Sequence, residues 1–226
     1  MRTDAVHLGG LAAVAALVAG GAAHAFERAS ADVLTASPAE FSGWAARYET
    51  ELLSQSLFFV LSTGFVVLVW SGLRSLAGGA AGAVAFGAGL VYAGLSLSAQ
   101  AIQVATARAA AGGIEPDVVA TLGDLMVVLL LVANLPLVVA LGAVAVAGHR
   151  HDGVPLWLGR LSAAAALVHL LPLLGIVATE GVMSAEGAIG YLAYPVFVAW
   201  LVAVAVVLLR ASAAVDRPKL PVGATP

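Results

Sequence analysis

Six long apolar segments constrain the fold of this chain more strongly than any other feature. They cover residues 8–26, 52–73, 76–104, 118–147, 157–178 and 188–209. A helix rises about 1.5 Å per residue, so about 20 apolar residues cross the hydrocarbon core of a bilayer. Hydrophobic residues make up 62% of the chain and charged residues only 10%. Soluble domains contain fewer hydrophobic and more charged residues. The sequence therefore predicts an all-α, polytopic transmembrane helical bundle with six spans.

The basic residues indicate how this bundle is oriented. If the N-terminus is cytoplasmic, most of them fall on the cytoplasmic side: Arg2, Arg74, Arg150, Arg160, Arg210, Arg217 and Lys219. The others, which then fall outside, are Arg28, Arg47 and Arg108. Because cytoplasmic loops are enriched in Lys and Arg, this pattern predicts that both termini are cytoplasmic. Residues 1–215 then form one transmembrane domain, and the proline-containing segment 216–226 is predicted to be a disordered cytoplasmic tail.

The first apolar segment has a second interpretation, as a secretory signal. Residues 1–25 combine a basic start, an apolar centre and the sequence Ala23-His24-Ala25, which is typical of a cleavage site. Cleavage would leave five spans with the same orientation. The segment is long and only mildly hydrophobic, so we favour a first helix that is retained.

Polar side chains gather toward the external ends of the predicted spans. Asp124 is the one acidic residue well inside a span, and carboxylates at such positions are costly and commonly functional. One face of the third span carries Tyr92, Ser96, Gln100 and Gln103, and the fifth span contributes His169. Other polar residues also lie toward the external ends of their spans: His24, Ser54, Gln55, Ser56, Tyr191 and Tyr194. We expect these side chains to line a polar vestibule that opens outward, with Asp124 hydrogen-bonded to Gln100 or Gln103.

Two interpretations of the same residues that involve no solute pathway also stay open. Asp124 is close enough to the external end of its span to lie at the interface, where water reaches it. The other polar side chains can equally form hydrogen bonds between helices, which hold a membrane bundle together without any solute pathway.

The long external loop 27–51 carries aromatic residues at helical spacing. Phe41, Trp44 and Tyr48 share one face of a potential short helix, and aromatic rings favour the headgroup region of a bilayer. The pattern predicts either an interfacial helix or a solvated loop with a few aromatic anchors.

Prolines and small residues predict details of helix packing. Pro136 and Pro172 lie within spans, where proline removes a backbone donor and bends a helix. The third span is rich in small residues that allow a neighbouring helix to approach closely: Gly78, Gly82, Ala85, Gly89 and Gly94. We interpret them as packing positions rather than as a dedicated dimer interface.

The residue types exclude several chemistries. The chain has no cysteine, which excludes disulfides, thiolate catalysis and cysteine-bound metals. Neither H-E-x-x-H nor G-x-S-x-G occurs, and the one lysine, Lys219, lies in the tail. We therefore expect no catalytic residues, no metal and no cofactor, and the protein is not predicted to be an enzyme. Without a basic patch we expect no nucleic acid; the expected partners are the lipid bilayer and either a second copy or another membrane protein.

Two short sequences carry a resemblance to a known family. They are Leu53-Ser54-Gln55-Ser56-Leu57-Phe58 at the start of the second span and Val154-Pro155-Leu156-Trp157-Leu158-Gly159-Arg160 before the fifth. With the layout of residues 8–210, they resemble a family of bacterial, largely actinobacterial, multi-span membrane proteins of unknown function. The resemblance implies a multi-pass protein of the bacterial cytoplasmic membrane and implies no activity.

Two functions are consistent with these patterns. The first is a small-solute transporter or channel-like protein that uses the outward polar vestibule. The alternative is a non-transporting structural, lipid-binding or regulatory membrane subunit.

Overall fold

In the computed structural model, the described residues are 2–27, 36–178 and 188–215, and within them the chain is helical without strands. The elements are α1 (Arg2–His24), α2 (Pro38–Arg47), α3 (Glu49–Ala77), α4 (Gly79–Ala111), α5 (Pro116–His149), α6 (Leu156–Leu170), the 3-10 helix η1 (Leu171–Ile176) and α7 (Ala188–Val215). The predicted tail, residues 216–226, lies outside the described residues.

Six segments in this part of the chain are long and apolar enough to cross a membrane, with α6 and η1 forming one of them. This confirms the predicted all-α, polytopic bundle. Several helices are longer than the apolar segments from which they were predicted. The 34 residues of α5 extend about 51 Å, whereas the hydrocarbon core is about 30 Å thick. The ends of α5 therefore project beyond the core.

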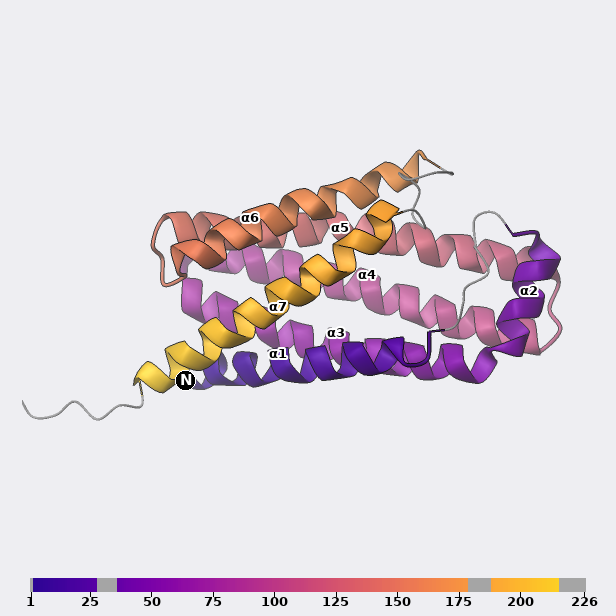
Figure 1. The fold of residues 1–226 in the computed structure, drawn as a ribbon, viewed down its shortest axis with the longest axis horizontal. Coiled ribbons are helices and arrows are strands. Elements are labelled where there is room, and N and C mark those ends of the chain that lie inside the picture. Colours follow the sequence, from indigo (N-terminus) through magenta and orange to yellow (C-terminus); the bar gives the residue numbers. More distant parts are fainter. Residues whose placement is uncertain (1, 28–35, 179–187, 216–226) are drawn as a thin grey trace, which may run out of the picture.

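The long helices pack mostly in chain order, as Figure 1 shows. α3 contacts α1 and α4, α5 contacts α4 and α6, and α7 crosses the bundle obliquely and packs mainly on α1. The short helix α2 lies across one end of the bundle, which we call the α2 end. The opposite end carries the start of α1 and the end of α7, and we call it the terminal end.

The helix α2 confirms the short aromatic helix that was one of the two predictions for this loop. Ser37 caps it, because the Ser37 hydroxyl accepts from the Glu40 amide and the Glu40 carboxylate accepts from the Ser37 amide. Its buried residues Phe41 and Ala45 pack near Ala110 and Val119 of the α4–α5 hairpin. The aromatic face therefore docks against protein and fixes α2 across the bundle.

Glycines set the spacing of the helices at the terminal end. A methyl group on Gly9 of α1 would come within 2.9 Å of the Cα atom of Gly72 in α3. A methyl group on Gly148 of α5 would come within 2.7 Å of the Cα atom of Gly159 in α6. Real side chains do not tolerate such distances, so both helix pairs are in backbone contact, as small residues allow in membrane proteins.

Two tryptophans fill the centre of the bundle. Trp70 of α3 and Trp200 of α7 are fully buried, with ring centroids 5.2 Å apart. The Trp70 ring lies directly over Gly89 of α4, where a methyl group would meet it at 2.5 Å. The small-residue face predicted for packing thus receives an indole at Gly89, whereas Gly94 on the same helix faces open space.

The helix changes type at one of the two prolines for which a kink was predicted, Pro172, and continues through the other, Pro136. Pro172 lies where the α-helix α6 changes into the 3-10 helix η1, so the missing backbone donor coincides with a change of helix type. Pro136 lies inside α5, which continues as one helix through it.

Substitution of Gly89 tests this central packing. We expect Gly89→Ala to lower the thermal unfolding temperature of the purified protein, because overpacking a rigid core costs about 1–3 kcal/mol. Gly94→Ala is the matched control on α4, and it should leave the unfolding temperature unchanged or slightly higher. Circular dichroism in detergent measures both variants, and equal unfolding temperatures would contradict the packing described here.

Candidate functional site

The six residues predicted to line one vestibule lie in different environments. Asp124 is exposed on the surface of α5, eight residues and about 12 Å from its first residue, Pro116. Ser96 and Gln100 are buried inside the bundle, and Tyr92 and Gln103 are partly buried. Asp124 thus occupies a surface position near one end of its helix, as the interface interpretation expects, and it does not join the others.

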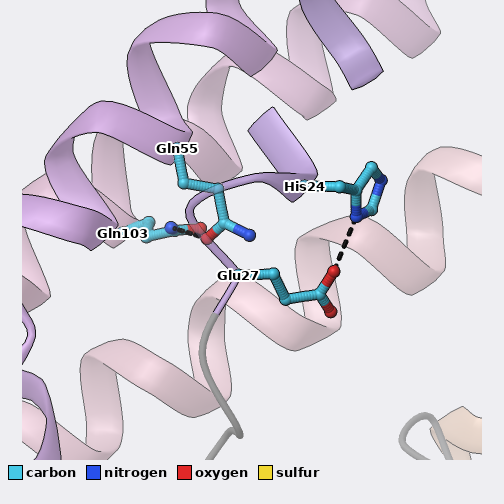
Figure 2. Close-up of polar contacts among 4 residues, drawn as sticks. All are labelled: His24, Glu27, Gln55 and Gln103. Carbon is cyan, nitrogen blue, oxygen red and sulfur yellow. Dashed lines mark hydrogen bonds and ion pairs between the residues drawn. The ribbon is translucent and has the colours of Figure 1, made fainter. Parts of the chain in front are cut away.

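The expected hydrogen bond between Asp124 and Gln103 is replaced by a contact between two amides. Gln103 Nε2 donates to Gln55 Oε1 over 2.9 Å and lies 3.4 Å from the Leu52 carbonyl oxygen (Figure 2). Both acceptors belong to α3, so this amide pair joins α3 and α4 near the α2 end. The buried carbonyl Oε1 of Gln100 has no hydrogen-bond partner within the described chain.

A small cavity lies beside this amide pair. It has a volume of about 100 Å³, enough for a few water molecules or a solute of a few non-hydrogen atoms. Its lining residues come from the end of α1, from α2 and from α3: Phe26, Glu27, Trp44, Tyr48, Glu51, Leu52 and Gln55. The lining therefore combines an amide, two carboxyl groups and three aromatic rings, and it contains no basic side chain.

His24 lies beside the cavity and connects three helices. Its Nδ1 donates to the Glu27 carboxylate over 2.6 Å (Figure 2). Its ring packs edge-on against Phe59 of α3 and lies 4.4 Å from the ring centroid of Tyr194 in α7. His24 Nε2 is buried and has no hydrogen-bond partner in the described part of the chain.

Further polar groups continue from His24 toward the middle of the bundle. A methyl group on Gly20 would meet the Tyr194 hydroxyl at 3.3 Å and the Ser62 hydroxyl at 3.4 Å, so both hydroxyls lie close to this glycine. The Ser62 hydroxyl donates to the Ala16 carbonyl over 2.9 Å. We call His24, Tyr194 and Ser62 the α1–α3–α7 seam. Deeper in the bundle, beyond this seam, Trp70 and Trp200 fill the interior.

A second polar pair lies near the middle of α5, far from the cavity. His169 is buried, and its Nδ1 donates to Asn134 Oδ1 over 2.8 Å. Asn134 Nδ2 donates in turn to the Leu130 and Leu131 carbonyls over 2.9 and 3.3 Å. This bonding leaves His169 Nε2 as a buried atom without a hydrogen-bond partner among the described residues. His169 also packs edge-on against Phe197 of α7, 6.0 Å between centroids.

The capping interaction stabilises α2, which contributes Trp44 to one wall of the cavity. Hydrogen bonds from the Ser37 hydroxyl and amide hold the pKa of Glu40 below its ordinary value, because they stabilise the charged carboxylate. Glu40 therefore favours the capped helix at neutral pH. Trp44 lines the cavity and stacks on Phe41 of the same helix, and Tyr48, the residue after α2, also lines the cavity and packs against Trp44 at a tilt.

Part of this site was not predicted from the sequence. Gln55 was expected among the polar residues at the external helix ends, but Glu27 and Glu51 were assigned to an external loop. The aromatic spacing of Phe41, Trp44 and Tyr48 was a second signal, because one of its two interpretations was the helix that now lies beside the cavity. Within the described residues, no group of three or more His, Asp or Glu side chains is arranged to hold a metal ion.

The His169–Asn134 pair is open to a double-mutant test. We expect His169→Leu and Asn134→Leu each to destabilise the protein by about 1–3 kcal/mol, because each leaves a buried polar group without a partner. The double variant should lose less than the sum of the two, since it removes both polar groups. Denaturant or thermal unfolding in detergent measures all three, and strictly additive losses would contradict a direct interaction.

Comparison of the chain with known proteins gives no match among family models, curated proteins or solved structures.

Proposed function

We propose that this protein is a small-solute transporter or channel-like membrane protein with an outward-opening polar site at the α2 end. The observation that carries the proposal is the cavity of about 100 Å³ between α1, α2 and α3. An amide and two carboxyl groups line this cavity at the end of a bundle whose helices are predominantly apolar. Polar groups in membrane helices are costly, so their concentration around one cavity supports a binding role.

The lining residues favour a small neutral or cationic solute over an anion. Glu27 and Glu51 disfavour negative charge, and Gln55 offers hydrogen bonds to a neutral polar molecule. The faces of Trp44, Tyr48 and Phe26 attract cations through their ring quadrupoles. The cavity volume limits the bound part of the solute to a few non-hydrogen atoms.

The α1–α3–α7 seam is the direction in which we propose that the solute proceeds. Its polar groups, His24, Tyr194 and Ser62, continue from the cavity into the bundle. Trp70 and Trp200 obstruct the bundle beyond them, because both rings are fully buried and in mutual contact. Under this proposal the cavity opens at the α2 end, and the pathway for the solute is closed in the middle of the bundle.

Solute flux tests this function directly. In proteoliposomes, we expect flux of urea, glycerol or methylammonium above that of protein-free liposomes, and no flux of acetate, because the carboxyl groups repel anions. Gln55→Leu should lower the flux by roughly five- to tenfold, which corresponds to the loss of one hydrogen bond. Ser54→Ala on α3 is the matched control, since the Ser54 hydroxyl donates to the Thr50 carbonyl of its own helix and Ser54 does not line the cavity.

An absence of flux for urea, glycerol and methylammonium alike would contradict the proposal and favour the non-transporting alternative. Acetate flux equal to that of methylammonium would contradict the proposed role of Glu27 and Glu51.

We also propose that the α2 end is external and that both termini are cytoplasmic, in the membrane of a bacterial cell. The excess of arginine at the terminal end supports this orientation. A retained first helix is supported by the packing of α1, in which Ala13 and Ala16 are almost completely buried and Gly9 contacts Gly72.

The orientation is testable because the chain contains no cysteine. Single substitutions Glu115→Cys and Asp152→Cys place thiols at exposed positions at the two ends of α5. In intact cells, a membrane-impermeant maleimide should label Glu115→Cys and should label Asp152→Cys only after permeabilisation. The reverse result would invert the proposed orientation.

A further inference from the structure

A second cavity lies at the terminal end, between the start of α6 and the last turns of α7. Its volume is about 280 Å³, and it is separate from the cavity at the α2 end. The residues that line it are Gly153, Pro155, Trp157, Val206, Val207, Arg210 and Ala211. We call this cavity the α6–α7 groove.

The groove exists because α6 and α7 meet at one level and separate toward the terminal end. They are joined where Trp200 Nε1 donates to the Ser162 hydroxyl over 2.9 Å, and Ser162 is fully buried. Between this contact and the terminal end, α7 runs obliquely toward α1 (Figure 1). A wedge-shaped space therefore opens between the two helices.

Both walls of the groove are held in place by the rest of the protein. On the α6 side, Val154 is buried in the core, and Gly153 has a φ of +75° with its Cα against the Leu76 carbonyl, where no side chain fits. On the α7 side, His7 Nδ1 donates to the Ser212 hydroxyl over 3.2 Å, and Leu209 packs against Gly10. The groove is thus preformed and does not depend on a ligand for its shape.

The charge of the groove is positive. Arg210 is its only charged lining residue, and no ion pair of Arg210 occurs within the described chain. The first turn of α6 contains no acidic residue to offset this charge. An unpaired guanidinium beside apolar walls favours a ligand that combines an anionic group with an apolar part.

The position of the groove beside the lipid-facing surface of the helices indicates the apolar part of the ligand. Val206 and Trp157 are 38% and 50% exposed, and both project from the surfaces of membrane-spanning helices. Lipid therefore surrounds them. Arg210 lies five residues before the end of α7, close to the membrane interface, where Trp157 is also favourably placed. Phospholipid phosphates lie at this level.

We propose that the α6–α7 groove binds the headgroup phosphate of an anionic phospholipid. Arg210 pairs with the phosphate, and Val206 and Trp157 contact the adjoining glycerol and upper acyl chain. This inference is independent of the proposed solute site, because the two cavities lie at opposite ends of the bundle and share no residue.

Native mass spectrometry of the full chain tests the proposal. The protein is released from mixed micelles that contain equal amounts of phosphatidylglycerol and phosphatidylcholine, and the retained lipids are counted. We expect a preference for phosphatidylglycerol that falls about fivefold in Arg210→Gln, the effect of one interfacial cation. Arg160→Gln is the matched control, since Arg160 is exposed on α6 at the same end but does not line the groove.

A second pair of variants tests the groove without changing any charge. Val206→Trp fills the groove and should abolish the preference while Arg210 is still present. Val202→Trp, one turn away on α7 at a position that is also exposed, should keep it. Circular dichroism confirms the fold of each variant.

Three outcomes would overturn the proposal. The first is an unchanged preference in Arg210→Gln and Val206→Trp. The second is an equal loss in Arg160→Gln, which would indicate only diffuse surface charge. The third is displacement of the lipid by inorganic phosphate alone at millimolar concentration, which would indicate a site for a soluble anion.

Discussion

The contact between the Trp70 ring and the backbone of α4 at Gly89 determines how the rest of the bundle is arranged. Only glycine leaves room for the indole, and the indole in turn packs against Trp200 of α7. Trp200 then bonds to Ser162 of α6. One pair of aromatic rings thereby connects α3, α4, α6 and α7 at a single level of the membrane. The polar cavity and the arginine-containing groove are kept apart by this layer.

Polar side chains on both sides of the Trp70–Trp200 pair have the same kind of surroundings. Lipid supplies no hydrogen bonds, so a polar side chain in a span is bonded to its own helix or to a neighbour. Ser62, Gln103, Asn134 and His169 all obey this rule. The exceptions are single buried atoms, including His24 Nε2 and His169 Nε2. These two atoms lie on helices that also contact α7, so a movement of α7 would change their surroundings first.

The elements of the fold were predictable from sequence, but the rotation of each helix was not. Length and apolar composition were enough to locate the spans, and the spacing of Phe41, Trp44 and Tyr48 predicted α2. The direction in which Asp124 points depends on which face of α5 packs inward. Leucine, valine and alanine occur on every face of α5, so no periodicity indicates that face. For the same reason Gln55 could not be identified as the partner of Gln103: the register between α3 and α4 is set by contacts such as Trp70 on Gly89.

The distribution of glycine contacts has a mechanical consequence. Two backbone-to-backbone contacts between helices, Gly9 with Gly72 and Gly148 with Gly159, both lie toward the terminal end, as does the packing of Leu209 on Gly10. Helices that touch backbone to backbone at one end and cross at an angle must splay at the other, and α2 with its aromatic residues occupies the space that results. The helices of the bundle are thus held closely together at the terminal end. A change of shape that leaves these contacts intact has its largest amplitude at the α2 end, where α2 moves together with the α4–α5 hairpin on which it is docked.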